Sequence, residues 1–328
     1  MAVKLTDVAK KAGVSATTVS RVINNHGYLS EKTKQKVFTA MQELNYQPNS
    51  LARSLQGKKM KLIGVVFPSI TNPFFAELIQ NIEEQLFDQG YKIILCNAGK
   101  NKQKEHEYIK MLIANQVDGI IAGAHNLGID EYQRLNLPIV SFDRKLSDNI
   151  PIVSCDNYQG MQLAVHDLLQ AGCKNIYFLG NKIQKGNPTD ERLEAYCDTI
   201  KALGLQEHIC SISFSDSPLL KNMAIHKMLE EDRPDGVVAT DDLSAILVLQ
   251  EAHKLGISVP DDLKVIGFDG TQEIQTYHSE LSTIEQPISD MATLLVKLLL
   301  QRIENPKKVF EQKHYKLPVK LIKSQTTA

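Results

Sequence analysis

The stretch LTDVAKKAGVSATTVSRVIN, residues 5–24, decides the fold of the first part of the chain. Thr6 can cap a short helix that runs through Lys11. Gly13 can end that helix, because glycine readily takes the left-handed conformation that closes many helices. A tight turn follows, and a second helix is predicted to run to Asn24. Two short helices joined by a tight turn are typical of a helix-turn-helix.

The second helix, from about Thr17 onward, has two different faces. At about 100° per residue, its apolar face carries Val19, Val22 and Ile23. The opposite face carries Thr17, Ser20, Arg21 and Asn24. Hydroxyl and amide groups can bind phosphates or bases, and an arginine can bind guanine through two hydrogen bonds. We therefore predict that this helix lies in the major groove of DNA. A third helix is expected to open at Ser30.

The charges along the chain are unevenly distributed. The net charge is −1, but residues 1–60 contain ten Lys and Arg residues against three acids, which leaves 27 basic and 35 acidic residues for the rest. A basic head on an acidic body is the pattern expected of a chain that binds a polyanion through one end. A solvated basic face would give the same counts, so charge alone does not settle the function.

A second short segment follows the predicted helices. Residues 50–56, SLARSLQ, read as a helix of barely two turns after the break at Pro48, and such a helix is marginal on its own. In a plain linker Leu51 and Leu55 would be exposed. If two copies of the segment met on DNA, Leu55 could enter a base step of the minor groove and kink it.

Residues 5–24, with the segments Tyr46-Gln-Pro-Asn49 and Leu51-Ala-Arg-Ser-Leu55, resemble the DNA-binding head and hinge of the LacI/GalR family of repressors. The resemblance implies binding to operator double-stranded DNA as a homodimer, because such operators are palindromic. The chain shows no leucine heptad near residue 328, so a dimer is expected rather than a tetramer. The implied DNA contacts are Thr6, Ser15, Ala16, Thr17, Thr18, Ser20, Arg21, Asn24, Tyr28, Ser30, Tyr46, Asn49, Ala52, Arg53, Leu55 and Gln56.

From residue 61 onward, strand-like apolar runs alternate with amphipathic helical stretches, which predicts parallel sheets covered by helices on both faces. The expected strands are 62–67, 92–96, 119–122, 139–142, 175–179, 236–239 and 263–268. Two smaller lobes are favoured over one large sheet. The family resemblance implies the same choice, with the fold of periplasmic sugar-binding proteins and chain crossings near Gln159, Pro287 and Pro318.

The expected fold class is thus an all-α helix-turn-helix head followed by an α/β, two-lobed effector domain of periplasmic-binding-protein type with doubly wound parallel sheets. The head is expected over residues 1–46, the hinge and linker over 47–60, and the effector and dimerisation domain over 61–328. Within that domain, the N-lobe is expected over about 61–159 plus 288–317, and the C-lobe over about 160–286 plus 319–328.

Doubly wound sheets bind ligands beyond the carboxyl ends of their strands, and polar or aromatic residues follow several of the expected strands. Carboxylates and guanidinium groups match pairs of sugar hydroxyls, and an aromatic ring can cover the apolar face of a sugar. The candidate ligand contacts are Asn72, Phe74, Phe75, Asp143, Arg144, Arg192, Asp241, Asp269 and Gln286. All but Asp241 match the family's contact pattern. Many members carry Asn at that position, and the extra negative charge weakens the case for a phosphate there.

Several longer stretches, such as residues 115–121 and 262–270, are most similar to the branch of the family that controls sucrose operons. This similarity implies sucrose, fructose or a phosphorylated derivative as the effector, with ribose as the near alternative. The sequence leaves open whether the effector induces or corepresses. A catabolite regulator with a phosphorylated carrier protein as corepressor is a second reading.

Several classes of function have little support. The chain carries no Gly-rich phosphate loop and no Gly-x-Ser-x-Gly elbow, so an α/β enzyme is disfavoured. The five cysteines are widely spaced and the histidines lack metal-ligand spacing, so we expect neither a disulfide framework nor a metal, and no cofactor. No segment has the length of a signal peptide or membrane helix, so we expect a cytoplasmic protein that binds no membrane.

Overall fold

The computed structural model forms two compact units, residues 1–60 and residues 61–328. It describes residues 3–24, 26–47, 59–124, 126, 129, 131–134, 137–181, 187–214, 216–306, 308 and 310–328.

The first unit is a three-helix head made of α1 (Leu5–Ala12), α2 (Ala16–Ile23) and α3 (Glu31–Glu43). Its core is formed by Val8, Ala9, Ala12, Val19, Val22, Val37 and Ala40. Val19 and Val22 belong to the apolar face predicted for the second helix, and Ile23, the third residue of that face, is partly buried against the core. Ser30 opens α3 as predicted, because its hydroxyl accepts a hydrogen bond from the backbone N–H of Thr33.

The beginning of α1 differs from the prediction. Thr6 is an exposed residue of the first turn and does not cap the helix. The N-cap is Lys4, whose backbone N–H donates a 2.8 Å hydrogen bond to the Asp7 carboxylate. An acidic side chain in the first turn stabilises the unpaired N–H groups there. The Asp7 carboxylate, rather than the predicted Thr6 hydroxyl, therefore provides the side-chain hydrogen bond at the start of this helix. Gly13 ends the helix as predicted, at φ 66°.

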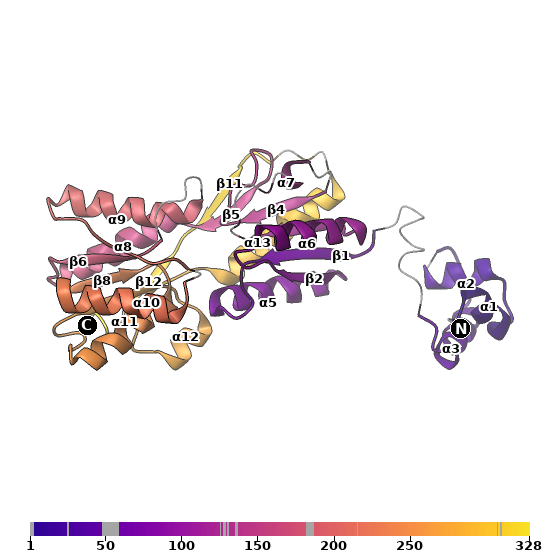
Figure 1. Cartoon of the computed structure of the whole chain (residues 1–328). Coiled ribbons are helices and arrows are strands. Elements are labelled where there is room, and N and C mark those ends of the chain that lie inside the picture. Colours follow the sequence, from indigo (N-terminus) through magenta and orange to yellow (C-terminus); the bar gives the residue numbers. More distant parts are fainter. Residues whose placement is uncertain are drawn as a thin grey trace. The chain divides into compact units, whose positions relative to one another are not determined.

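The first sheet of the second unit has the strand order β11-β5-β4-β3-β1-β2, and all its pairs are parallel. Its strands are β1 (Leu62–Phe67), β2 (Lys92–Asn97), β3 (Gly119–Ala122), β4 (Ile139–Phe142), β5 (Ile152–Cys155) and β11 (His314–Leu317). Helices α5 (Pro73–Asp88) and α13 (Ile288–Glu304) pack on one face. Helices α6 (Lys102–Ala114) and α7 (Glu131–Arg134) pack on the other (Figure 1).

The second sheet has the order β12-β10-β9-β8-β6-β7, and only β12 pairs antiparallel. Its strands are β6 (Ile176–Gly180), β7 (His208–Ser211), β8 (Gly236–Ala239), β9 (Lys264–Asp269), β10 (Ser282–Glu285) and β12 (Lys320–Ile322). The helices of this lobe are α8 (Asn157–Gln170), α9 (Glu191–Ala202), α10 (Pro218–Lys227), α11 (Asp242–Leu255) and α12 (Gln272–Tyr277).

Strand β6 shows why both faces of the second sheet are covered. Ile176 and Phe178 belong to the core shared with α8 and α9, whereas Tyr177 and Leu179 belong to the core shared with α10 and α11. Successive side chains of a strand point to opposite faces, so a strand with no polar alternation needs a helix layer on each side. The predicted doubly wound, two-lobed fold is confirmed.

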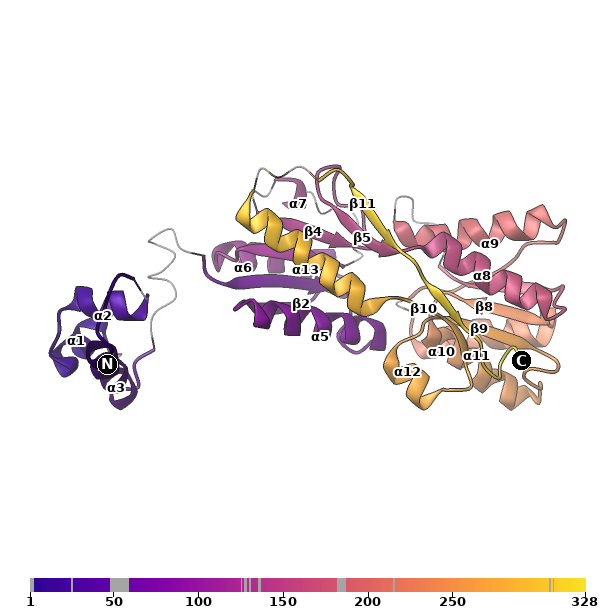
Figure 2. The same cartoon turned by 180° about the vertical axis from the view of Figure 1, so that it is seen from behind.

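The chain passes between the two sheets three times: after β5, after β10, and between β11 and β12. Figure 2 shows the last passage as the yellow strands that run from one lobe into the other. Across the described residues, no helix combines the length and apolar character needed to span a bilayer.

Candidate functional site

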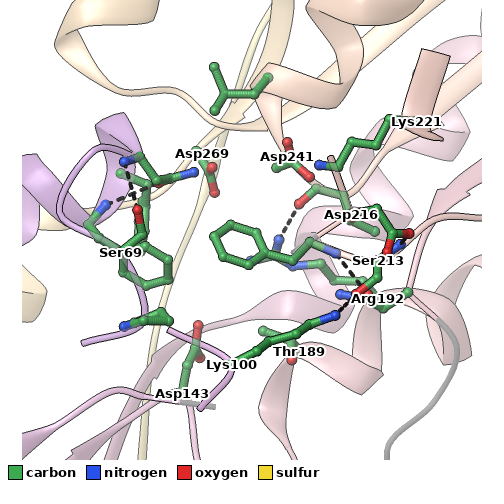
Figure 3. A pocket seen from close by; sticks show the side chains of 18 of the residues that line it. Ser69, Lys100, Asp143, Thr189, Arg192, Ser213, Asp216, Lys221, Asp241 and Asp269 are labelled. Carbon is green, nitrogen blue, oxygen red and sulfur yellow. Dashed lines mark hydrogen bonds between the residues drawn. The ribbon is translucent and has the colours of Figure 1, made fainter. Parts of the chain in front are cut away.

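A cavity of about 700 Å³ lies between the two sheets of the second unit. Its wall is built from the segments that follow the carboxyl ends of strands in both sheets (Figure 3). The first lobe contributes among others Ser69, Asn72, Phe74, Phe75, Lys100 and Asp143. The second lobe contributes among others Arg192, Ser213, Phe214, Lys221, Asp241 and Asp269, and Gln286 comes from the passage after β10. A parallel sheet places its ligand at this edge.

Two buried oxygen atoms in this wall have no hydrogen-bond partner among the described residues: Oδ1 of Asp143 and Oε1 of Gln286. Both side chains are 3% exposed. Buried polar atoms are normally paired, because an unpaired one loses its hydration without compensation. Both atoms accept hydrogen bonds, so the cavity is built to receive a molecule that donates them.

The guanidinium group of Arg192 is held firmly at the edge of the cavity. Its Nε donates a 2.7 Å hydrogen bond to Asn157, and one terminal nitrogen donates to the backbone carbonyl of Thr240. The group also lies 3.6 Å from the centre of the Phe268 ring. Arg192 is the second residue of α9, and Figure 3 shows it in the wall of the cavity together with Asp143. A cation in this fixed position can bind a neutral oxygen of a ligand.

The carboxyl groups of the cavity have unusual acidities. Burial raises the pKa of Asp143 to about 6, although the nearby Arg192 guanidinium acts in the opposite direction. Burial and the neighbouring Asp242 carboxylate raise the pKa of Asp269 well above its usual value. Asp269 also accepts a 2.8 Å hydrogen bond from the amide nitrogen of Gln286. Perturbed carboxyl groups of this kind gather at binding sites.

Asp242 is buried behind the cavity wall and does not line the cavity itself. It is 1% exposed and accepts hydrogen bonds from the Thr283 hydroxyl at 2.5 Å and from the Gly270 backbone at 2.7 Å. Burial raises its pKa to about 6. Asp241, which does line the cavity, caps α11 by accepting hydrogen bonds from the backbone and hydroxyl of Ser244.

Aromatic rings form an apolar part of the wall. Phe74 and Phe75 lie edge to face with their centres 5.4 Å apart, and the Phe75 ring meets Phe214 of the other lobe at 5.7 Å. An aromatic face of this kind can cover the C–H side of a sugar ring, while the polar groups bind its hydroxyls.

Arg144 does not line the cavity, which corrects the prediction of a ligand contact. Its guanidinium is buried behind the wall, where it pairs with Glu105 at 3.0 Å and donates to the backbone carbonyl of Ala124. Glu105 is fully buried and also accepts hydrogen bonds from Asn126 and Tyr132. The buried carboxylate draws the arginine inward, because a charge in the interior needs an opposite charge and hydrogen bonds.

The structure adds residues that the sequence did not indicate. Asn157 is fully buried at the start of α8 and holds Arg192. Lys100, from the first lobe, donates a 2.7 Å hydrogen bond to the hydroxyl of Ser213 in the second. Lys221, on α10, is only 7% exposed and donates to the Ser244 hydroxyl. These positions follow from the packing of distant segments, so no local pattern marks them.

In the head, several candidate DNA contacts lie on the surface or at the ends of helices. Thr17 and Arg21 are exposed on α2, and Tyr28 is 94% exposed between α2 and α3. Asn24 ends α2 and donates a 2.8 Å hydrogen bond to the backbone carbonyl of Ser20. The other described candidates are Thr6, Ser15, Ala16, Thr18, Ser30 and Tyr46.

The predicted hinge helix lies outside the described residues. So do its candidate DNA contacts, which are Asn49, Ala52, Arg53, Leu55 and Gln56.

A helix-turn-helix head followed by a two-lobed cavity domain defines the class of ligand-responsive bacterial regulators. The model for bacterial regulatory proteins of the lacI family matches residues 4–49, and the model for a periplasmic binding protein-like domain matches residues 165–327. A sucrose operon repressor from Pediococcus pentosaceus is 58% identical, with 98% of this chain and 99% of the relative covered. The chain belongs to the lacI family.

Two solved structures extend the comparison. The lac repressor dimer bound to operator and the anti-inducer ONPF is 27% identical, with a TM-score of 0.85 and coverage of 100% of this chain and 99% of that one. A periplasmic binding protein/LacI transcriptional regulator from Alkaliphilus metalliredigens, complexed with D-xylulofuranose, is 32% identical, with a TM-score of 0.73 and coverage of 82% and 99%.

Proposed function

We propose that this protein represses a sucrose-utilisation operon and that a small sugar, sucrose or fructose, releases it from a palindromic operator. The main observation that supports an effector site is a pair of buried oxygen atoms, on Asp143 and Gln286, that accept no hydrogen bond from the described residues. Both residues line a cavity between the two lobes. The nearby Arg192 guanidinium and the phenylalanine rings complete a surface for hydroxyl groups and a C–H face.

The relatives support this choice of sugar. The relative that shares 58% identity over nearly the whole chain is a sucrose operon repressor. The structure with D-xylulofuranose holds a five-membered sugar ring in a related protein, and fructose forms such a ring in sucrose. The relatives are regulators, so an enzymatic activity is not proposed.

We assign DNA binding to the head, residues 1–46, and to the hinge over residues 47–60. The polar face of α2, with Thr17, Ser20 and Arg21, would enter the major groove, while Leu55 would act in the minor groove. The structure of the lac repressor dimer on its operator supports a homodimer for this chain. The protein would act in the cytoplasm, where operator DNA lies.

The mechanism that fits this architecture is a shift between two arrangements of the lobes. A sugar that contacts Asp143 in one lobe and Arg192 in the other favours the arrangement in which both reach it. That arrangement would misplace the paired hinge segments on DNA. The coupling is reciprocal, so operator DNA must weaken sugar binding by the same factor.

The test is fluorescence anisotropy of the full chain on a labelled palindromic operator, titrated with sucrose, fructose and ribose at one fixed salt concentration. Release by sucrose or fructose supports the proposal, and release by ribose alone would assign the protein to ribose instead. Tighter binding with sucrose would make the sugar a corepressor. Operator binding that no sugar alters, but that a phosphorylated carrier protein strengthens, would replace the proposal with the catabolite reading.

A further inference from the structure

The two lobes contact each other through side chains of the cavity wall. Lys100 of the first lobe donates a hydrogen bond to Ser213 of the second, and the ring of Phe75 meets that of Phe214. All four residues line the cavity. A substitution at any of them would therefore change the ligand-binding surface and the contact between the lobes together.

A further contact joins the lobes outside this wall. Glu77, on α5 of the first lobe, accepts a 2.9 Å hydrogen bond from the backbone N–H of Gln272, the first residue of α12 in the second lobe. The two residues are 195 positions apart in the chain, and Figures 1 and 2 both show α5 and α12 side by side. Neither residue belongs to the described wall of the cavity.

Both partners of this bond lie on elements that start at the cavity. Asn72, a wall residue, caps the helix that carries Glu77. Asp269, another wall residue, lies three positions before Gln272. A movement of the lobes that separates Glu77 from Gln272 therefore also moves Asn72 relative to Asp269. The bond reports, and can stabilise, one spacing of the two sides of the binding site.

The chemistry of the bond suits a contact that forms and breaks. The first N–H groups of a helix have no partner within the helix, and a carboxylate is a stronger acceptor than a neutral oxygen. Lys316 and Glu191 also join the lobes, at 2.7 Å. Lys316 lies on β11, directly before the passage to β12, and residues beside a pivot move little relative to each other. Glu77 and Gln272 lie far from the passages in sequence.

We infer that Glu77 is a positioning residue for the effector response. Its bond to Gln272 stabilises the arrangement of the lobes in which one sugar reaches both, and so raises the affinity for the sugar and lowers the affinity for the operator. This inference rests on the proposed function, because it assumes that the sugar and the operator favour different arrangements. The ratio of the two affinities is then proportional to the equilibrium between the arrangements.

Two substitutions remove the bond from its two sides. Glu77→Ala deletes the acceptor, and Gln272→Pro deletes the donor, because proline has no N–H. Proline is favoured at the first position of a helix. Thr271 before it is extended, at ψ 155°, as the residue before a proline requires. The bond is exposed to solvent, so each substitution should lower the ratio of sugar affinity to operator affinity about threefold to fivefold. The double variant should lower it no further.

Three controls separate the bond from other effects of the same substitutions. Glu84→Ala removes a carboxylate that pairs with Gln80 on the same helix, and Gln272→Ala shortens the side chain but keeps the N–H. Both should keep the ratio of the parent. Glu77→Gln should keep most of it, because the amide oxygen can still accept from the Gln272 N–H. A ratio as low in Glu77→Gln as in Glu77→Ala would show that this hydrogen bond is not the cause.

The measurements use the full chain, with isothermal titration calorimetry for the sugar and fluorescence anisotropy for the labelled operator at one salt concentration. The probes are sucrose, fructose and ribose, and the ratio is taken for each sugar that releases the parent. An unchanged ratio in Glu77→Ala or Gln272→Pro, or a further fall in the double variant, overturns the inference alone. Operator binding by the parent that none of these sugars weakens overturns both the inference and the proposed function.

Discussion

Arg192 and Asn157 are joined by a 2.7 Å hydrogen bond from the guanidinium Nε to the side-chain oxygen. Asn157 begins α8 directly after the chain leaves the first sheet at β5, whereas Arg192 lies in the first turn of α9. The bond therefore ties the cation of the second lobe to the passage between the lobes. With Phe268 beneath it, the guanidinium is oriented before any ligand arrives, which lowers the entropic cost of binding.

Arg192→Lys should separate the two activities of the protein. A lysine keeps the charge but lacks the planar fork that binds Asn157, Thr240 and a ligand together. We expect the affinity for the sugar to fall about tenfold or more and operator affinity to stay within about twofold. Calorimetry and anisotropy measure the two affinities. Unchanged sugar affinity would show that the planar fork takes no part in binding.

Ser15→Ala should lower the stability of α2 and the affinity for the operator without changing the affinity for the sugar. The Ser15 hydroxyl caps α2 by accepting a 3.1 Å hydrogen bond from the Thr18 backbone. Loss of such a cap costs about 1 kcal/mol, and operator affinity should fall because α2 frays at the end that would contact DNA. Anisotropy on the operator measures the loss.

The matched control for this cap is Ser217→Ala, which removes the equivalent hydroxyl from the start of α10 in the other unit. The control should bind the operator as the parent does. Equal operator affinity in Ser15→Ala and the parent would contradict the proposed placement of α2 on DNA.

Sugar binding should strengthen as the pH rises from about 5 to about 7. Burial raises the pKa of Asp143 to about 6, so the free protein holds a proton there in the lower part of this range. A sugar hydroxyl that donates to Oδ1 favours the charged form, so binding lowers this pKa and releases protons near pH 6. Calorimetry in two buffers of different ionisation enthalpy measures the protons released.

The groups that face Asp143 determine the size of this effect. Arg192 and a hydrogen bond with Asn157 favour its charged form and Glu191 opposes it, while burial also raises the pKa of Asp242 and Asp269, which are further sources of protons. Asp143→Asn should therefore reduce the proton release rather than abolish it. The same release in variant and parent would exclude Asp143 as its source.

The same shift has a consequence for stability, with a definite sign. The folded pKa of Asp143 lies above its ordinary value of 3.8, so the folded state keeps a proton that the unfolded state has lost. This carboxyl thus favours the folded state below about pH 4, and that contribution is lost as the pH rises through about 6.

The strands that the sequence predicted are those with unbroken apolar runs, such as β1 and β8. These runs are buried on both faces, so their composition alone identifies them. Strand β7 at a sheet edge, with alternating half-buried and exposed residues, offers no such run and was not predicted. The same holds for β11, whose residues are half-buried or exposed.

The rule that ligands lie beyond strand ends indicated Asn72, Asp143, Asp241 and Asp269, and the structure places them along one cavity. Their contact with a sugar stays a prediction. The rule did not distinguish Asp143 from Arg144, because adjacent residues point in different directions and Glu105, distant in sequence, attracts only the second. Asn157 and Lys221 were missed because their positions depend on packing between helices that the sequence does not relate.

Glu105→Ala should be among the most destabilising substitutions in the first lobe. Glu105 is fully buried and accepts from Arg144, Asn126 and Tyr132. Its removal leaves the guanidinium of Arg144, 4% exposed, without its counter-charge, and breaking a buried pair in this way costs about 3–5 kcal/mol. Urea denaturation followed by circular dichroism measures the loss.

The matched control is Glu107→Ala, two residues along the same helix. Glu107 pairs with Lys110 at 3.7 Å with both side chains more than half exposed, and an exposed pair contributes about 0–1 kcal/mol. Because Arg144 follows Asp143 directly, Glu105→Ala should also displace Asp143 and lower sugar affinity. A loss below about 1 kcal/mol, or one no larger than that of the control, would show that the buried pair does not hold this wall of the cavity in place.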